Sequence, residues 1–377
     1  MMEYKKLGDI ATYVNGYAFK PEQRGKKGLP IIRIQDLTGN SYDLGYYEGD
    51  YPKKIELNNG DVLISWSASL GVYHWNRGKA LLNQHIFRVV FDKGEIDKSF
   101  FVYAVRQKLK EMGTKTHGAT MKHIVKKDFD AIEIPYPQIN RQIEIARNMD
   151  KISSVIEKKE RQLKLLDDLI QARFVEMFGT LDNPTQNFQT ARLEELCSKI
   201  TDGKHGGCVQ EKGTKRYFVG AREIYDDKIH YDTAPEININ EFEKDYKRCN
   251  VEIGDFLIVN TGATIGKSAI ATDERTIHTL LQKSVALLKV RKELLNSVFL
   301  KWCYRVNTKM YMVESASAQA NLLLSKIRKT KIYVPDINLQ NKFASFVQQV
   351  NKSKFEVQKS LEKTQLLFDS LMQEYFG

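Results

Sequence analysis

The sequence has 377 residues, of which 42% are hydrophobic and 28% charged, so it can form two globular units with cores of their own. Its net charge of +11 suits a polyanionic partner such as nucleic acid. No run of eighteen apolar residues occurs, and residues 1–10 lack the apolar segment of a secretory signal. We therefore expect a cytoplasmic protein with no membrane association.

The first 138 residues have the pattern of a mixed domain of strands and helices. Short runs rich in apolar and β-branched residues, at 29–37, 61–65 and 85–91, are separated by glycine, asparagine and aspartate turns and predict strands. A helix is expected at 98–112. From residue 139 to about 180 the pattern changes to that of one long helix.

The second half of the chain repeats this order, with a strand expected at 256–260, a helix at 294–310 and a second long helix at the end. We therefore predict four segments. They are a first globular domain at 1–138, a central helix at 139–180, a second globular domain at 185–336 and a C-terminal helix at 337–377.

The repeat is also visible in short motifs. The segment Pro137-Gln-Ile-Asn-Arg-Gln142 recurs as Pro335-Asp-Ile-Asn-Leu-Gln340, at the start of each long helix. The turn Gly60-Asp61-Val-Leu-Ile likewise corresponds to Gly254-Asp255-Phe-Leu-Ile in the second half. One structural unit therefore occurs twice.

Each long helix carries apolar residues at spacings of three and four, interrupted only by Lys159 and Arg173 in the first helix and by Lys354 and Thr364 in the second, which is typical of a coiled-coil seam. The first stripe comprises Ile145, Met149, Ile152, Ile156, Leu163, Leu166, Ile170 and Met177. The second comprises Phe343, Val347, Val350, Val357, Leu361, Phe368, Leu371 and Tyr375. Because each stripe needs a partner, we expect the two helices to form an antiparallel coiled coil. The predicted fold class is α/β (α+β), with two globular domains joined by that coiled coil and related by a pseudo-two-fold internal repeat.

Patterns that could signal catalysis fail on their spacing. The segment Gly262-Ala-Thr-Ile-Gly266-Lys-Ser resembles a phosphate-binding loop, but it has three residues between its glycines where that loop needs four. No Gly-x-Gly cofactor turn occurs, and no Glu-x-Lys follows Pro335-Asp336 as a common type of nuclease site would require. The four cysteines contain no Cys-x-x-Cys pair, and the seven histidines have no metal-ligand spacing. We therefore predict free thiols, no catalytic residue and no metal site.

Taken together, the duplicated layout, the two Gly-Asp turns, the Ala263-Thr-Ile-Gly-Lys267 loop and the two helix starts resemble the specificity subunits of Type I restriction-modification systems. The resemblance covers essentially the whole chain. It implies two target recognition domains, each of which reads one half of a split site in double-stranded DNA. It also implies two conserved helices that set the spacing and bind two methyltransferase subunits, with restriction subunits as further partners. S-adenosylmethionine, ATP and magnesium are then expected in the partner subunits, and no cofactor in this chain.

Positions that are equivalent in the repeat but differ in chemistry are candidates for reading different half-sites. Gln35, in Arg33-Ile-Gln35-Asp36, aligns with Arg222, in Gly220-Ala-Arg222-Glu223. Glutamine pairs with adenine, and arginine with guanine, through two hydrogen bonds in the major groove. A surface polar residue at a strand end explains this position equally well.

Two loops offer hydroxyl groups, backbone N–H groups and one lysine, a combination that suits phosphate contacts. They contain Ser65, Trp66, Ser67 and Ser69 in the first half, and Asn260, Thr261, Thr264 and Lys267 in the second. Purely structural turns are the competing interpretation.

The remaining candidates for DNA contact are polar residues in loops near the predicted strands. Gln84 and His85 align with Gln282 and Lys283, and Lys122 lies in a stretch that aligns with the one holding Gln319 and Asn321. Loops near the start of each domain add Asn15, Tyr17, Lys20 and Arg33 in the first domain, and Lys204, His205, Lys215 and Arg216 in the second. Turn and capping roles explain several of these residues nearly as well.

The function expected from the sequence is therefore sequence-specific DNA binding by a subunit that is not catalytic by itself. Two alternatives stay open: a restriction enzyme with an unrecognised active site, and a non-specific basic DNA-binding coiled-coil protein. The second is disfavoured because the two domains differ at Gln35 and Arg222, a difference that non-specific binding does not require.

Overall fold

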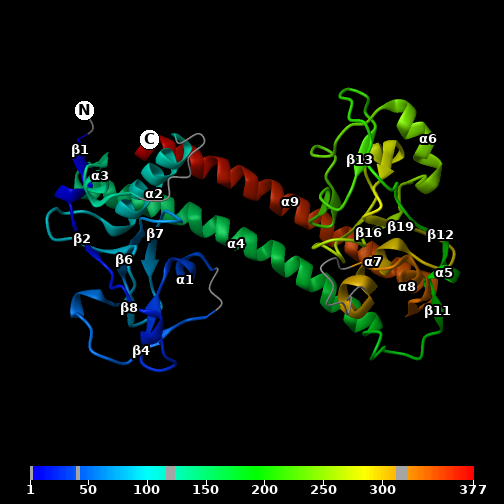
Figure 1. Ribbon diagram of the computed structural model, residues 1–377, viewed down its shortest axis with the longest axis horizontal. Helices are drawn as coiled ribbons and strands as arrows, with labels where there is room; N and C mark the ends of the chain where they lie inside the picture. Colours follow the sequence, from blue (N-terminus) through cyan, green and yellow to red (C-terminus); the bar gives the residue numbers. More distant parts are fainter. Residues whose placement is uncertain (1–2, 40–42, 116–123, 311–320) are drawn as a thin grey trace. The chain divides into compact units, whose positions relative to one another are not determined.

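The computed structural model describes residues 3–39, 43–115, 124–310 and 321–377. It divides into two compact units, of which the first holds Met1–Glu160 together with Lys359–Gly377, and the second holds Arg161–Gln358. Each unit is a globular domain with one half of each long helix, as the colours along the chain show (Figure 1). None of the helices in the described ranges is both long enough and apolar enough to cross a membrane.

The centre of the first unit is a four-stranded antiparallel sheet with the strand order β2-β9-β6-β7. Its strands are β2 (Thr12–Asn15), β6 (Asp61–Ser65), β7 (Gly71–Trp75) and β9 (Ile86–Val90). Successive side chains of a strand point to opposite faces. Val62 and Ile64 accordingly enter one apolar cluster and Leu63 enters another, so this sheet is covered on both faces.

A second sheet of the first unit has the strand order β4-β3-β8-β5, with β3 and β8 parallel. Its strands are β3 (Leu29–Ile32), β4 (Tyr46–Tyr47), β5 (Glu56–Leu57) and β8 (Ala80–Leu82), and a separate ladder joins β1 (Tyr4–Lys6) to β10 (Glu133–Pro135). The helices are α1 (Ile34–Thr38), α2 (Lys98–Lys115) and α3 (Lys126–Asp130), with 3-10 turns η1 (Leu7–Asp9), η2 (Pro21–Gln23) and η3 (Lys53–Ile55).

The second unit repeats this plan, with a four-stranded sheet of order β12-β19-β16-β17. Its strands are β12 (Cys197–Asp202), β16 (Phe256–Val259), β17 (Ser268–Ile270) and β19 (Val285–Val290). The smaller pairs are β13 (Tyr217–Val219) with β18 (Thr279–Leu281), β14 (Ile224–Tyr225) with β15 (Lys228–Ile229), and β11 (Thr190–Arg192) with β20 (Lys331–Tyr333). The helices are α5 (Leu193–Leu196), α6 (Ile239–Cys249), α7 (Ser297–Val306) and α8 (Leu324–Lys329), with η4 (Glu274–His278) and η5 (Thr308–Met310).

Most of the expected short elements occur near their predicted positions, and one expectation is wrong. The run 29–37 is not a single strand, because β3 ends at Ile32 and the helix α1 follows. Two local features explain the change. The Asp36 carboxylate accepts the backbone N–H of Arg33 at the start of the helix, and Gly39 ends the helix with a φ of 77°.

The long helices α4 (Ile139–Phe178) and α9 (Ile337–Phe376) run antiparallel within each unit. In the first unit the Arg141 guanidinium lies over the Tyr375 ring, and the Lys159 ammonium donates to the Ser360 hydroxyl at 2.7 Å. In the second unit Arg173 lies over Phe346, and Lys354 pairs with Asp167 at 2.6 Å. The early residues of one helix thus meet the late residues of the other in both units.

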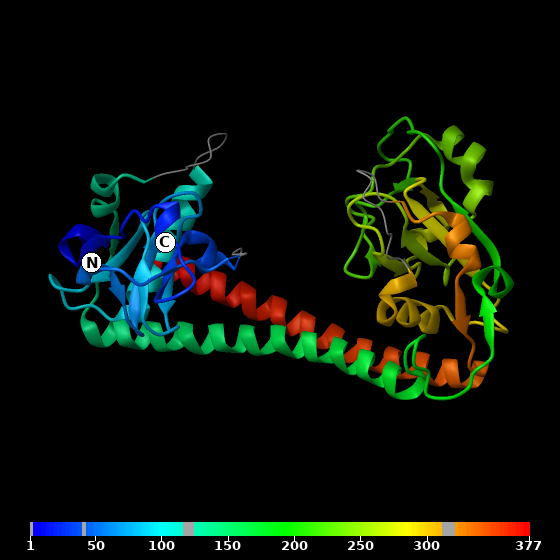
Figure 2. The same cartoon turned by 60° about the horizontal axis from the view of Figure 1, so that its bottom comes forward.

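The predicted seam is only partly a helix-to-helix contact. In the first unit Ile145, Met149, Met372 and Phe376 are buried in the same cluster as the globular core, so the helix ends form the base of the domain (Figure 2). In the second unit Ile170, Phe174, Phe178, Phe343, Val347 and Val350 do the same. The predicted stripes omit Phe174, Phe178, Met372 and Phe376. These residues pack against the globular cores, and the prediction considered only contacts between the two helices.

The shared motif at the two helix starts has a defined structural task. The Gln340 side chain is fully buried, accepts the Asn296 N–H at 2.9 Å and donates to the carbonyls of Pro335 and Leu294 at 2.8 and 3.1 Å. Gln142 accepts the Asp97 N–H at 3.0 Å and donates to the Pro137 carbonyl at 2.8 Å. Gln340 therefore joins the start of α9 to the start of α7, and Gln142 joins the start of α4 to the start of α2.

Candidate nucleic-acid interface

Strand register in the first unit brings several predicted residues to one end of the main sheet. Asn15 pairs with Phe87, and Ser65 pairs with both Ile86 and Gly71, so the end of β2, the end of β6 and the start of β9 lie together. Backbone N–H groups of Trp66 and Gln84 donate to the carbonyls of His85 and Tyr17, which joins the connecting loops. We call residues 15–20, 33–38, 65–70 and 83–85 the first loop surface.

The second unit has the same arrangement. Asp202 pairs with Ala286 and Val259 pairs with Val285, while the Asn260 N–H donates to the Ser284 carbonyl. We call residues 202–205, 220–223, 259–267, 282–284 and 321 the second loop surface.

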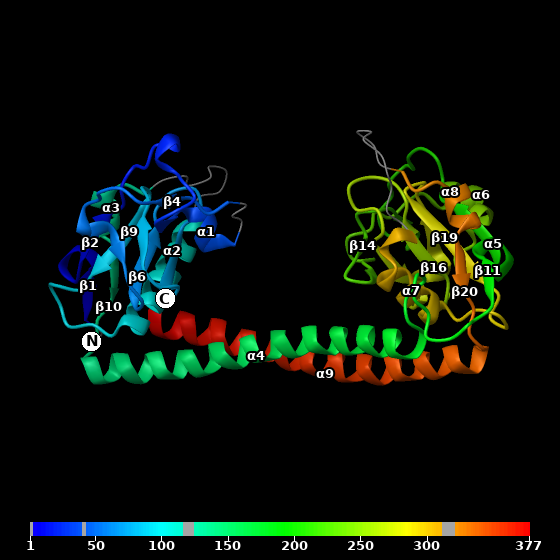
Figure 3. The same ribbon diagram turned by 90° about the horizontal axis from the view of Figure 1, so that it is seen from below.

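Both loop surfaces lie at the strand ends that are farthest from α4 and α9 within their own unit. The opposite end of β6 adjoins Gly60, whose carbonyl accepts a hydrogen bond from Lys98 on α2. The start of β16 adjoins Gly254, whose carbonyl accepts the Ser297 hydroxyl of α7 at 2.6 Å. Since α2 and α7 are the helices tied to α4 and α9, each loop surface faces away from the two long helices, and Figure 3 shows each main sheet above those helices.

A glycine in each unit permits the closest approach between these loops, and the sequence reasoning missed it. A Cβ on Gly16 would lie 1.9 Å from the Asn83 carbonyl oxygen, and one on Gly203 would lie 2.1 Å from the Leu281 carbonyl oxygen. No side chain fits at either position. Comparing Asn15-Gly16-Tyr17 with Asp202-Gly203-Lys204 would have revealed this shared glycine.

The alignment of Gln35 with Arg222 agrees with the geometry of the backbone around them. Asn83 and Gln282 donate their backbone N–H groups to Ile32 and Val219, which fixes the equivalence of the two strands β3 and β13. Gln35 and Arg222 are then the third residues beyond these carbonyls, and both are exposed.

The alignment of the next polar pair needs a correction of one residue. Tyr17 bridges Asn83, and Lys204 bridges Gln282, so Asn83 is the counterpart of Gln282. Gln84 therefore corresponds to Lys283, and His85 to Ser284. The sequence comparison aligned Gln84 with Gln282 because both are glutamines, although the structural counterpart of Gln282 lies one residue earlier, at Asn83.

Three predicted contact residues are turned inward. Ser65 is fully buried and its hydroxyl donates to the Ser69 carbonyl, while Asn260 is only 4% exposed. Trp66 is half-buried and its ring stacks on Phe87 at 5.5 Å. These positions argue against direct DNA contact by the three side chains, which instead support the loops.

Several predicted basic residues have partners within their own unit. Lys204 pairs with Asp245 at 2.7 Å and Glu241 at 3.4 Å on α6, and the hydrogen bond to Asp245 raises the pKa of its ammonium. The Arg33 Nε lies 3.3 Å from the Asp36 carboxylate. The positive charges of Lys204 and Arg33 are therefore offset within their own units.

Smaller contacts hold three more of the predicted residues. The His205 ring lies 3.5 Å from Asp202, and the Arg216 guanidinium lies over the Phe242 ring. The Thr261 hydroxyl donates to the Asn321 side chain at 3.3 Å, which joins the β16–β17 loop to the chain before α8.

The other predicted residues are at or near the surface. Exposed side chains are those of Asn15, Tyr17, Lys20, Ser69, Gln84, Lys215, Lys267, Lys283 and Asn321. Half-buried ones are those of Ser67, His85, Thr264 and Gln282. Lys122 and Gln319 lie outside the described residues. The structure thus gathers exposed polar side chains around both loop surfaces without assigning any of them a contact to DNA.

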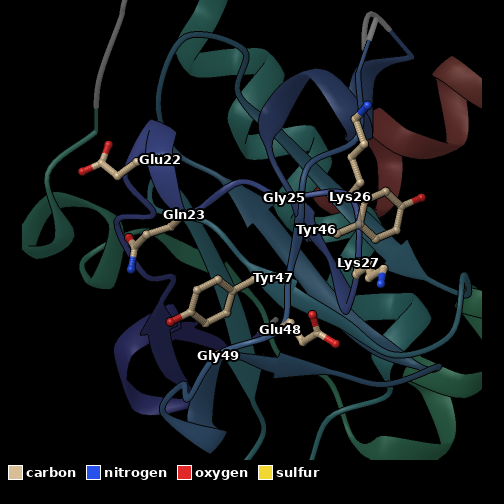
Figure 4. A pocket seen from close by; sticks show the side chains of 9 residues that line it. All are labelled: Glu22, Gln23, Gly25, Lys26, Lys27, Tyr46, Tyr47, Glu48 and Gly49. Carbon is tan, nitrogen blue, oxygen red and sulfur yellow. The ribbon is translucent and has the colours of Figure 1, made fainter.

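A shallow hollow adjoins the first loop surface. Lys26 and Lys27 lie on one side of it, Tyr46 and Tyr47 on the strand beside them, and Glu22 and Glu48 complete much of its rim (Figure 4). Since two carboxylates offset the two ammonium groups, the hollow has no charge preference for phosphate. In the described part of the chain, no group of three or more histidine, cysteine, aspartate or glutamate side chains could hold a metal ion.

Comparison with known proteins gives the class of the chain. The family model of the Type I restriction modification DNA specificity domain matches residues 1–166 and again residues 185–366. The chain therefore belongs to this family, and its internal repeat consists of two copies of the family domain.

Two relatives match different shares of the chain. The chain is 23% identical to the Type I restriction enzyme EcoBI specificity subunit of Escherichia coli, over 95% of this chain and 80% of that protein. It is also 23% identical to the MjaVIII specificity subunit of Methanocaldococcus jannaschii, over 52% of this chain and 46% of that one.

Solved structures share the fold. A Type I restriction-modification S subunit from M. genitalium has a TM-score of 0.58 at 16% identity, and the match covers 100% of this chain and 96% of that one. A chain from a study of complex assembly and conformational transition in the type I system has a TM-score of 0.59 at 14% identity, covering 99% and 97%.

Proposed function

We propose that this chain is the sequence-reading, non-catalytic subunit of a Type I restriction-modification complex, and that each loop surface reads one half of a split DNA site. The proposal rests on one exposed position that occurs in both domains but carries a different side chain in each. Gln35 and Arg222 occupy equivalent places on equivalent folds, and they are the side chains best suited to adenine and guanine, respectively. Two copies of one domain with different reading groups suit an asymmetric split site.

The division of labour between contacts follows from the same surfaces. Exposed lysines such as Lys20, Lys267 and Lys283 would bind phosphates and fix the position of each domain on the duplex. Gln35 and Arg222 would then supply the sequence preference. Because phosphate contacts release counterions, binding by both domains should weaken steeply as salt rises.

The long helices offer surfaces for the partner subunits. Leu165, Leu169 and Phe355 are exposed on the helices of the second unit, and Leu366 and Leu367 on α9 in the first. Exposed large apolar side chains on an otherwise charged helix are typical of a protein interface. We propose that two methyltransferase subunits bind there, that restriction subunits join them, and that S-adenosylmethionine, ATP and magnesium belong to those partners.

The docking part can be tested separately from DNA reading. Replacing Phe355, which is 65% exposed, by aspartate should weaken co-purification of the methyltransferase subunits. Ser353→Asp adds the same charge to an exposed position on another face of the same helix and should leave co-purification unchanged. Equal capture by both variants would remove Phe355 from the interface.

The reading part is tested by co-expressing the chain with the adenine methyltransferase subunits of its own host and mapping N6-methyladenine across the genome. A control culture lacks the chain. We expect a new motif of two short half-sites at a fixed spacing that depends on the chain. A stable complex without any such motif would refute the proposal and favour non-specific binding or an independent enzymatic role.

A further inference from the structure

We propose that Asp36 and Glu223 are positioning residues for base selection, because each carboxylate fixes the turn that presents the adjacent reading residue, Gln35 or Arg222. This inference rests on the proposed function of the two loop surfaces. Both carboxylates accept backbone N–H groups, and that of Asp36 also contacts the Arg33 side chain, so the two residues would act through their neighbours and not by touching DNA.

In the first unit the carboxylate is built into the turn. Asp36 Oδ2 accepts the backbone N–H of Arg33 at 2.8 Å, and the Asp36 side chain is only 2% exposed. The Arg77 guanidinium donates to the Asp36 backbone carbonyl at 2.8 Å, which holds the same residue from another segment. Gln35 precedes this anchored residue and is itself exposed.

The second unit makes the same hydrogen bond with a longer side chain. Glu223 Oε2 accepts the backbone N–H of Gly220 at 2.8 Å, and Glu223 is buried. The Ala221 N–H donates to the Ser284 hydroxyl at 3.2 Å, and the Glu223 carbonyl accepts the His230 N–H at 2.8 Å. Arg222 is therefore flanked on both sides by residues whose backbone is held.

The two units thus reach one geometry with two different residues. An aspartate in one unit and a glutamate in the other both bond to the N–H three residues earlier, although the side chains differ by one methylene. What the units share is a buried acceptor, an anchored turn and an exposed side chain immediately before the acceptor. The exposed side chain is the part that differs in chemistry.

This arrangement affects selectivity more than affinity. Two hydrogen bonds to one base require a fixed side-chain origin, since a small displacement breaks one of them. Phosphate contacts by exposed lysines tolerate such displacement. Removing the acceptor should therefore leave DNA binding largely intact while the base preference at one position is lost.

The experiment uses the complex with its methyltransferase subunits and the genome-wide methylation map. Asp36→Ala should reduce discrimination at one position of the first half-site about ten-fold, the cost of losing a hydrogen bond to a charged group. The second half-site and the spacing should not change. Glu223→Ala should do the converse, so each domain is the internal control for the other.

Further variants keep the test decisive where an alanine variant folds poorly. Asp36→Glu and Glu223→Asp exchange the two natural acceptors and should restore much of the selectivity. Asp50→Ala and Glu243→Ala remove exposed carboxylates from the same domains and should preserve both half-sites. Thermal unfolding of each complex reports whether the variants are folded.

The outcomes separate the inference from the function on which it rests. Unchanged selectivity in folded Asp36→Ala and Glu223→Ala complexes would overturn the positioning role. So would equal relaxation of both half-sites by either variant, since that indicates a general structural defect. Absence of a split motif with the unaltered chain would instead overturn the proposed function itself, before any variant is compared.

Discussion

Replacing Gln340 by alanine gives a direct measure of how the start of a long helix is attached to its globular domain. The side chain is fully buried and makes three hydrogen bonds to backbone groups of Asn296, Pro335 and Leu294. Each buried group left without a partner costs about 1–3 kcal/mol, reduced where water enters the space. We therefore expect Gln340→Ala to lower the free energy of unfolding by about 3 kcal/mol.

The equivalent change in the first unit should cost less. Gln142 makes two such hydrogen bonds, to Asp97 and Pro137, so Gln142→Ala should lower the free energy of unfolding by about 2 kcal/mol. Gln348→Ala removes an exposed glutamine from the same helix as Gln340 and should change the free energy of unfolding by less than about 0.5 kcal/mol.

Tryptophan fluorescence during urea unfolding separates the two units. Trp302 is 3% exposed and is the only tryptophan of the second unit, while Trp66 and Trp75 belong to the first. A chain with Trp66→Phe and Trp75→Phe reports on Gln340, and a chain with Trp302→Phe reports on Gln142. If Gln340→Ala shifts the Trp302 transition no more than Gln348→Ala does, the attachment is not made by this side chain.

Three further predictions concern the loop surfaces and the thiols. Gly203→Ala should destabilise the second unit by about 2 kcal/mol, because its Cβ would meet the Leu281 carbonyl oxygen; an unchanged urea midpoint would contradict this. In the methylation map, Gln35→Arg should change one position of the first half-site from adenine to guanine, with guanine favoured over adenine by about 1–3 kcal/mol. The second half-site should not change. Ellman's reagent should react with about one thiol per folded chain, which we assign to half-buried Cys208. The other three thiols are protected by burial, which raises the pKa of Cys249 to about 11 and that of Cys303 to about 12. Reaction of a Cys208→Ser chain would disprove that assignment.

The short strands were predictable where the chain alternates or concentrates apolar residues. The run 61–65 became β6 because Val62, Leu63 and Ile64 serve clusters on both faces of a sheet. The run 29–37 failed after Ile32, since an apolar pattern does not register that Asp36 accepts an N–H and starts a helix. Capping by a side chain three residues away is a local signal, but it competes with the stronger strand pattern.

Burial at the loop surfaces could not be read from residue type. Ser65 is the last residue of β6 and Asn260 directly follows β16, and both polar side chains are buried because they lie at the ends of packed strands. Lys204 is basic, yet its charge is matched by Asp245 and Glu241 from α6, about forty residues later in the chain. Such pairings depend on which distant segment packs nearby.

The sequence by itself determined the duplication, the two long helices, the position of the Gly-Asp turns and the family, because these depend on repeated letters and on periodicity. Only the tertiary structure decided how the apolar stripes divide between a helix pair and a domain core. Phe174 and Phe376 are buried because a globular core rests on them, a third surface that periodicity along one helix cannot reveal. The sequence repeat already aligned Gln35 with Arg222, and the tertiary structure added the strand register and the buried carboxylates that hold the backbone beside each of them.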